Sequence, residues 1–358
     1  MMDSAEPPVV TREIRHLLAR DYAALDPELG RAIHLLAGRN AAVSWHKHGV
    51  FLDHLIGTYR ILRLWGEPRA TCLCGLFHSV YANEYVDLAL FDARTERGVL
   101  AEAVGGEVEE LAHTLCLMPR TEFALRVLDD AAALQRGMTL GDPQGGAAWR
   151  LSAETVRAFL AVTIADFAEQ WFGWQDEVMG GYPHTDERRR AAEHWTKALW
   201  PGPLQPSAAN MSLQSRLARR LPEFPGPVPP IFERCTRLLS PEDEAAAAAL
   251  YWRVAGAGPA PDSIGRAADM LAEAIARNPW LGEAHLHLAQ LELLEGDFAA
   301  AGEHAQRGLR LLLDWGTPRD KRIPWEGWVA WSRVLIKGAR ERAWPQTLRA
   351  LNNLGLVE

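Results

Sequence analysis

Three residues of this sequence combine a side chain that can bind a transition metal with a position on or beside an apolar helical stripe. His54 lies in "FLDHLIGTYRILRLWG", His78 in "TCLCGLFHSVY" and Asp166 in "VRAFLAVTIADFAEQ". At 100° per residue, both histidines fall at the edge of the apolar face of their predicted helices, where a ring can point between helices. Asp166 falls within the apolar face of its helix. Two histidines and one carboxylate are the donor set of mononuclear non-haem iron sites.

Each of these residues also has a structural explanation. A histidine at the edge of a buried face commonly hydrogen-bonds a backbone group. A carboxylate on an apolar face requires a metal or a cationic partner, and Arg120 or Arg157 could pair with Asp166. Taken singly, the three residues leave a packed and a metal-binding interpretation open.

The layout of the three residues resembles that of the HD superfamily, helical metal-dependent enzymes named for a His-Asp doublet. His54 and His78 lie 24 residues apart on consecutive predicted helices, and Asp166 lies on a later one. The segments "DHLIGTYRILRLWG", "GLFHSVY" and "ADFAEQ" are similar to an HD-like family, over roughly residues 40–175. The resemblance implies a phosphoester hydrolase with a metal ion bound by His54, His78 and Asp166.

The sequence departs from that superfamily at its doublet, which is His78-Ser79 rather than His-Asp. A serine hydroxyl is a poor ligand for Mn²⁺ or Fe²⁺, so the resemblance implies one ion, Fe or Mn, rather than two. Dinuclear oxygenases of this superfamily also need two further histidines between His78 and Asp166, where this chain has only His113. An iron-dependent oxidative reaction and a site that has lost its metal both stay open.

Three other residues are candidates for catalysis beside the metal. His46 precedes the first helix and could be a fourth ligand or a proton shuttle, or an exposed loop residue. Glu84 follows His78 by about two helical turns and could be a general acid or base, or a solvent-facing carboxylate at a helix end. Arg120 could bind an anionic substrate or pair with Asp166.

Helical periodicity dominates the chain, and no convincing strand alternation occurs, so the fold class predicted is all-α. One expected helix covers residues 68–83 and carries His78. The proline clusters of "WPGPLQPSAANMSLQSRLARRLPEFPGPVPP" predict a linker. The domains expected are therefore an HD-like domain over 1–200, a proline-rich linker over 201–234 and a second helical domain over 235–358.

The second domain contains two segments that align at a 34-residue period, the first beginning at residue 248. Small residues in the second copy, including Gly296, Ala301 and Gly308, fall where paired helices touch closely. The pattern resembles the tetratricopeptide repeat. A third helix pair is expected over residues 321–355. Seven of the fourteen tryptophans follow residue 250, which predicts an exposed aromatic surface. The resemblance implies a peptide or protein partner.

The composition and charge of the chain argue against nucleic acid and membranes as partners. Hydrophobic residues make up 48% and charged residues 23%, as in a soluble globular protein. The net charge of −8 argues against binding nucleic acid by broad phosphate neutralisation. No apolar run approaches the roughly 20 residues of a membrane span. The acidic N-terminus is unlike a secretory signal, and four cysteines without a CxxC pair fit a reduced cytoplasmic protein.

Three functions are therefore expected from the sequence. The first is a metal-dependent enzyme acting on a small anionic or peptide-linked substrate, by hydrolysis or by iron-dependent oxidation. The second is a degenerate HD-like domain that binds a small anion without turnover. The third is a scaffold that binds a partner through its repeats.

Overall fold

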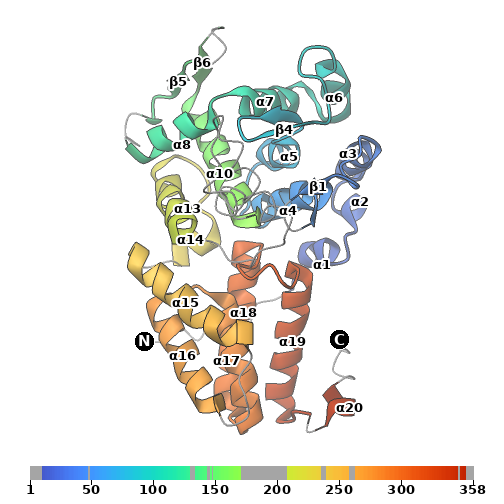
Figure 1. Cartoon of the computed structure of the whole chain (residues 1–358). Helices are drawn as coiled ribbons and strands as arrows, with labels where there is room; N and C mark the ends of the chain where they lie inside the picture. Colours follow the sequence, from blue (N-terminus) through green and yellow to red (C-terminus); the bar gives the residue numbers. More distant parts are fainter. Residues whose placement is uncertain are drawn as a thin grey trace, which may run out of the picture. The chain divides into compact units, whose positions relative to one another are not determined.

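The structure is a computed structural model of the chain and is mainly helical (Figure 1). It describes residues 10–46, 49–129, 134–142, 146, 148–170, 208–234, 239–257, 263–345 and 347–351. The predicted all-α class is confirmed, because the strands of these residues form only three two-stranded hairpins. None of the described helices is long and apolar enough to cross a membrane.

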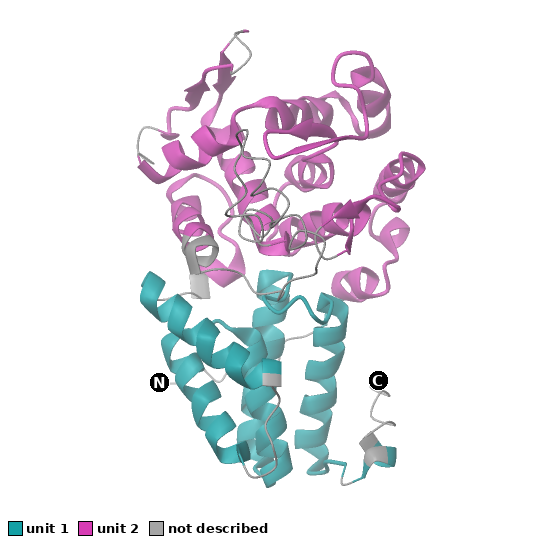
Figure 2. Cartoon of the chain, in the orientation of Figure 1, with its two compact units in different colours: residues 1–11, 207–212, 235–358 teal, residues 12–206, 213–234 magenta. Residues whose placement is uncertain are grey.

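The described chain divides into two compact units (Figure 2). The larger unit takes in the described residues between 12 and 170, together with 213–234. The smaller unit takes in those from 239 onward, together with 10–11 and 208–212. The segment predicted as a linker therefore contains residues 213–234, which cluster with the larger unit. Residues 171–207, where the predicted first domain ends, lie outside the described part of the chain.

The larger unit consists of short helices and the three hairpins. Its helices are α1 (Arg12–Leu18), α2 (Tyr22–Leu25), α3 (Pro27–Gly38), α4 (Phe51–Leu64), α5 (Arg69–Phe77), α6 (Arg97–Val104), α7 (Gly106–Leu117), α8 (Arg120–Asp129), α10 (Ala153–Gln170), the part of α13 (Ala208–Arg220) from Leu213 onward, the 3₁₀ turn η1 (Leu221–Glu223) and α14 (Pro230–Arg234). Its strands are β1 (Trp45–His46), β2 (Gly49–Val50), β3 (Tyr81–Asn83), β4 (Val86–Ala89), β5 (Met138–Leu140) and β6 (Trp149–Leu151).

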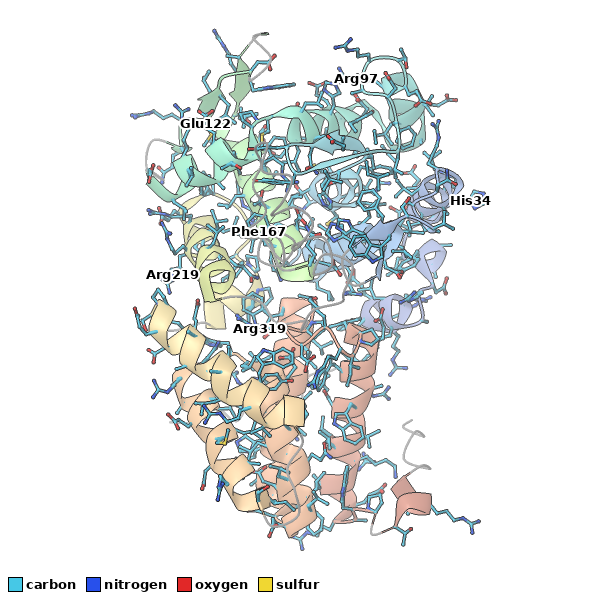
Figure 3. The ribbon with its side chains drawn as sticks, in the orientation of Figure 1. His34, Arg97, Glu122, Phe167, Arg219 and Arg319 are labelled. Atoms are coloured by element: carbon cyan, nitrogen blue, oxygen red, sulfur yellow. The ribbon has the colours of Figure 1, made fainter. Side chains whose placement is uncertain are left out.

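Helix α10 is the core helix of this unit, because every residue from Val156 to Gln170 is buried. It packs against α4 and α5. A helix buried on all sides is normally apolar on all sides. Near its C-terminal end, α10 nevertheless carries Asp166, Glu169 and Gln170, and Phe167 beside them marks this end in Figure 3. These buried polar groups require partners on the neighbouring helices.

Helix α5 is shorter than the helix predicted over residues 68–83, because it ends at Phe77 and His78 is its C-terminal cap. The chain then turns into the β3–β4 hairpin. The Asn83 side-chain oxygen accepts hydrogen bonds from the backbone N–H groups of Tyr85 (2.8 Å) and Val86 (3.1 Å). An asparagine that bonds its own following backbone stabilises a turn against a helix. Glu84 thus lies in a hairpin turn and not on the helix of His78.

The smaller unit contains α15 (Pro241–Ala257), α16 (Ile264–Arg277), α17 (Gly282–Glu295), α18 (Phe298–Trp315), α19 (Trp325–Glu341) and α20 (Leu348–Leu351). Each helix from α15 to α19 packs against the next. Helices α17 and α18 approach closely at Gly308, which has no side chain. A Cβ added there would lie only 2.5 Å from the Leu286 side chain. This succession agrees with helical repeats, and the repeat family stays a prediction.

Among the described residues, α19 is followed by the short helix α20. Because residues 346 and 352–358 lie outside the described part of the chain, the expected third helix pair stays a prediction. The expected aromatic surface is wrong for the described residues. The tryptophans of this unit are buried or half-buried: Trp252, Trp280, Trp315, Trp325, Trp328, Trp331 and Trp344. The indole N–H groups of Trp325 and Trp328 donate to the backbone carbonyls of Leu312 and Asp320, so these rings are anchored inside the unit.

Candidate metal centre

His54, His78 and Asp166 converge in the larger unit, from α4, the end of α5 and α10. Each offers one donor atom, and these atoms all lie within 4.8 Å of one another. The two Nε2 atoms are 3.1 Å apart, and the Asp166 carboxylate oxygens lie 3.5 Å from His54 Nε2 and 3.7 Å from His78 Nε2. Ligands at about 2.1 Å from one ion, with angles of about 90–110°, lie about 3.0–3.5 Å apart. These three residues can therefore hold a metal ion.

The second nitrogen of each histidine fixes which nitrogen faces the centre. His54 Nδ1 lies 2.6 Å from a Glu169 carboxylate oxygen, and His78 Nδ1 lies 2.7 Å from the Gly75 carbonyl oxygen. A carboxylate and a carbonyl oxygen are acceptors, which favours the proton on Nδ1 in both rings. In its neutral form each ring then turns the lone pair of Nε2 toward the other ring, and the two Nε2 atoms lie 3.1 Å apart. Only a proton or a cation between them makes this contact favourable.

The charge environment favours the metal-binding forms of these groups. Burial lowers the pKa of His78 to about 4, although Asp166 acts in the opposite direction. His78 is therefore neutral at pH 7, which is the form that ligates metals. Burial alone would raise the pKa of Asp166, but positive charge on its neighbours holds it below its usual value, and with His78 neutral that charge comes from the Arg120 guanidinium at 2.7 Å. Asp166 is therefore ionised.

Glu169 is a buried carboxylate that lies behind a ligand rather than among the ligands. It is 6% exposed and orients His54 through Nδ1. A carboxylate in this position raises the basicity of a ligating histidine and fixes its ring. Gly57 on α4 makes room for it, because a Cβ there would lie 2.6 Å from Glu169 Cγ. The sequence analysis missed Glu169, although its spacing of three residues from Asp166 places both on one face of α10.

Both oxygens of Asp166 accept hydrogen bonds. Arg120 donates from its Nη2 to one oxygen at 2.7 Å, and the Gln170 amide donates to the other. The Gln170 side-chain oxygen lies 2.6 Å from His46 Nε2, so His46 is joined to the ligand set through Gln170. The ion pair expected for Asp166 is thus formed with Arg120. The other candidate, Arg157, pairs instead with Glu67 at 2.5 Å.

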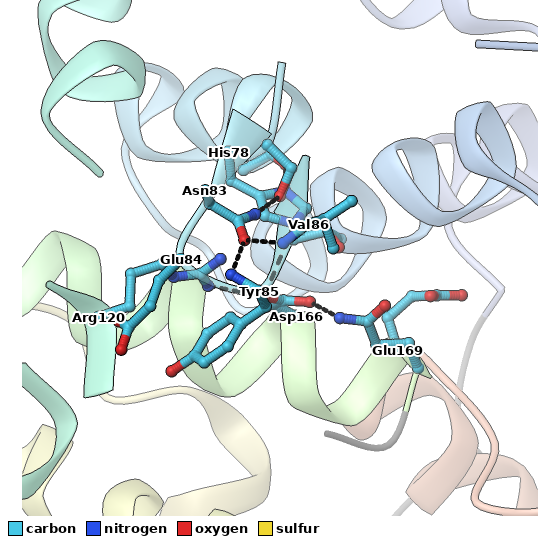
Figure 4. Close-up of polar contacts among 12 residues, drawn as sticks. His78, Asn83, Glu84, Tyr85, Val86, Arg120, Asp166 and Glu169 are labelled. Atoms are coloured by element: carbon cyan, nitrogen blue, oxygen red, sulfur yellow. Dashed lines mark hydrogen bonds and ion pairs between the residues drawn. The ribbon is translucent and has the colours of Figure 1, made fainter. Parts of the chain in front are cut away.

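The structure places Glu84 outside the ligand set (Figure 4), and Ser79 is not part of that set either. The Glu84 carboxylate accepts a hydrogen bond from the backbone N–H of Thr121 at 2.8 Å, one residue after Arg120. It therefore caps the start of α8, and its catalytic role stays a prediction. Ser79 Oγ accepts from the Asn83 amide at 2.8 Å and supplies no ligand. Tyr85 lies against Arg120, with the guanidinium carbon 5.7 Å from the ring centroid.

Comparison with known proteins gives a family without an assigned function. Domain of unknown function (DUF6817) matches residues 35–120. The match includes His46, His54, His78, Glu84 and Arg120, and it ends before Asp166. No curated protein matches the chain significantly. No solved structure matches it significantly either.

Proposed function

We propose that this chain is a metal-dependent enzyme with one ion bound by His54, His78 and Asp166, and that the ion is Fe or Mn. The observation that carries the proposal is the meeting of two Nε2 atoms, each in a ring oriented through its Nδ1, beside a buried carboxylate. Imidazole and carboxylate together suit these borderline ions. Ser79 contributes no charged oxygen, which supports a single ion.

When bound, such an ion would activate a water molecule or polarise a substrate oxygen. The protein residues would hold the ligand geometry. Glu169 keeps the proton of His54 on Nδ1, and the Gly75 carbonyl does the same for His78. Arg120 and Gln170 each hold one oxygen of Asp166, which favours ligation through one oxygen and leaves positions for water and substrate.

The proposed substrate carries an anionic group, and the proposed reaction is hydrolysis of a phosphoester. Arg120 supports this choice because its guanidinium has five N–H donors and, among the described residues, bonds only Asp166. The remaining donors suit a phosphate or carboxylate. Asp166, Glu169 and Arg120 leave the buried cluster with one net negative charge. A divalent ion reverses that sign, so the loaded site favours an anion.

His46 is the residue we propose for proton transfer. Its ring centroid lies 4.7 Å from that of His54, and its Nε2 contacts Gln170, which in turn donates to Asp166. An imidazole so close to a metal ligand is placed to accept or deliver the proton of a metal-activated water. Glu84 is the second candidate for this role.

An iron-dependent oxidation is the second candidate function. Two histidines and one carboxylate that leave open positions are the donor set of non-haem iron oxygenases, which supports it. The identity of the metal separates the two. An iron protein that consumes O₂ with substrate would be oxidative, whereas a manganese protein active without O₂ would be hydrolytic.

The deciding experiment is the metal content of protein purified without chelators, measured by mass spectrometry beside His54→Ala. About one Fe or Mn per chain, lost in the variant, supports the proposal, and phosphoester panels assayed with and without O₂ then test the reaction. A chain that binds neither ion, even after reconstitution, would overturn it. The larger unit would then be a helical domain with a packed histidine pair.

A further inference from the structure

The loop of residues 316–324, between α18 and α19 in the smaller unit, is bound by side chains of three helices. Asp320 at its centre is fully buried. Its carboxylate accepts a hydrogen bond from the Tyr251 hydroxyl of α15 at 2.6 Å. Its backbone N–H donates to Glu283 of α17, and its carbonyl accepts from the Trp328 indole of α19, both at 3.0 Å. One loop residue therefore contacts α15, α17 and α19.

Most of these contacts are made to the backbone of the loop. Glu283 accepts hydrogen bonds from two consecutive N–H groups, those of Arg319 and Asp320. Trp328 donates to a backbone carbonyl. Backbone contacts of this kind hold a segment whatever its sequence, whereas the Tyr251 hydroxyl selects an acceptor such as a carboxylate. The face formed by Tyr251, Glu283, His287 and Trp328 is called the loop-bound face. It is thus equipped to bind a segment that forms the same turn and carries one aspartate.

His287 shows that the loop does not satisfy this face completely. Its ring packs between those of Tyr251 and Trp328, with centroid distances of 5.6 and 5.7 Å. Its Nε2 is buried and has no hydrogen-bond partner among the described residues. A buried polar atom left without a partner lowers the stability of the folded chain. A ligand that also bonded His287 would therefore bind this face better than the loop does.

The solvent side of the loop is held by one accessible side chain. Arg322 is paired with Asp320 at 2.5 Å and donates to the Ala255 carbonyl of α15 at 2.6 Å. Its guanidinium carbon also lies 5.0 Å from the centroid of the Trp252 ring. The Arg322 side chain is 39% exposed, so a competing segment can reach it from solvent. Figure 3 labels Arg319, the loop residue that precedes Asp320 and whose backbone N–H also donates to Glu283.

We propose that the 316–324 loop is an intramolecular strap over the loop-bound face, and that a protein segment with a similar turn and an aspartate displaces it. Because the strap is part of the same chain, it competes at an effective concentration of the order of millimolar. The partner expected is therefore a protein segment that presents aspartate to Tyr251, backbone N–H groups to Glu283, a backbone carbonyl to Trp328, and a hydrogen-bonding group to His287. This inference is independent of the metal centre.

The test uses the full chain with residues 318–323 replaced by a Gly/Ser segment of equal length. A fluorescent peptide with the sequence of residues 315–325 is added, and binding is followed by anisotropy. We expect at least about tenfold tighter binding to the replaced chain than to the unmodified one, because the competing strap is gone. Asp320→Asn in the peptide should weaken binding by about tenfold or more, since a charged hydrogen bond is lost.

Lys321→Ala in the peptide is the matched control, because the Lys321 ammonium donates a hydrogen bond to Thr317 within the loop itself. That peptide should bind as well as the original. A replaced chain that keeps its helical circular dichroism but binds neither peptide, or binds the Asp320→Asn peptide equally, would overturn the proposal.

Tyr251→Phe gives a second test if the replaced chain does not fold. Loss of this one hydroxyl should release the strap, so trypsin should cleave after Lys321 and Arg322 several times faster than in the unmodified chain. Added peptide should accelerate cleavage of the unmodified chain in the same way. Unchanged cleavage in both experiments would mean that the loop is a fixed part of the unit.

Discussion

Each unit contains a pair of buried or half-buried histidines, and the two pairs are built differently. In the larger unit, His54 and His78 come from separate helices, and their Nε2 atoms meet at 3.1 Å. In the smaller unit, His285 and His287 lie two residues apart on α17, and their rings face different neighbours, one on α18 and one on α19. This divergence follows from helix geometry, because residues two apart on a helix point about 200° apart.

The comparison shows that burial does not distinguish a metal site from a packed pair. Burial lowers the pKa of His78 and His287 to about 4 and that of His285 to about 3. The two pairs differ in the hydrogen-bond partners of their ring nitrogens. In the first pair, both Nδ1 atoms have acceptors and both Nε2 atoms face one point. In the second pair, each ring leaves one buried nitrogen without a partner among the described residues.

The largest effect expected from this difference is on metal binding. His78→Ala and Asp166→Ala should each lower the affinity for Fe²⁺ or Mn²⁺ by more than about 100-fold, because each removes a ligand from a set of three. His285→Ala and His287→Ala are the matched controls and should keep one ion per chain. Titration calorimetry and metal analysis measure both. Full metal binding by Asp166→Ala would show that Asp166 is not a ligand.

Glu169 should have the next largest effect, because it orients a ligand without being one. Glu169→Ala should weaken metal affinity by about 10–100-fold. Glu169→Gln should weaken it less, since its amide oxygen still accepts from His54 Nδ1. Glu292→Gln is the control, because Glu292 bonds a histidine in the smaller unit, His304, at 2.8 Å. Equal affinities for all these variants would contradict the orienting role.

Gly57→Ala should destabilise the larger unit by about 1–3 kcal/mol, because the new Cβ would lie 2.6 Å from Glu169 Cγ. Relief of that overlap moves Glu169 away from His54, so metal affinity should fall as well. Gly38→Ala is the control, since nothing lies within 4 Å of its Cβ position, and should be neutral or stabilise by up to about 1 kcal/mol. Urea unfolding with and without metal measures both effects. Similar stabilities of the two variants would contradict the packing described here.

Acid should destabilise the smaller unit through His285. Its folded pKa is about 3, below the ordinary value of 6.5, because the ring is buried. The unfolded chain therefore binds a proton that the folded chain does not, and stability falls as the pH drops below about 6.5. The slope per histidine is at most about 1.4 kcal/mol per pH unit. His285→Asn should reduce this slope in urea unfolding between pH 7 and pH 5, and an unchanged slope would contradict the assignment.

The smallest effect is expected at Ser79. Ser79→Ala should leave metal stoichiometry unchanged and alter affinity by less than about threefold, because its hydroxyl bonds Asn83 and lies outside the ligand set. Loss of the ion in this variant would show that the hydroxyl takes part in ligation and would require a revised ligand set.

Sequence periodicity was sufficient to predict the helices that carry the site. His54 and Asp166 lie on α4 and α10, as their apolar stripes indicate. The end of α5 was predicted wrongly, because the helical pattern continues past His78 while Asn83 bonds two backbone N–H groups of its own turn. A local hydrogen bond of this kind leaves no trace in hydrophobic periodicity. The hairpin strands have two to four residues, too few to show an alternation.

The sequence by itself determined the all-α class, the residue types of the metal centre and the divergence of His285 and His287. These follow from rotation per residue and from side-chain chemistry, which are local properties. Only the tertiary structure decided that Glu169 stands behind His54, that Arg120 rather than Arg157 pairs with Asp166, and that residues 316–324 cross three helices. Such contacts join side chains far apart in the chain, and helix packing alone sets which of them meet.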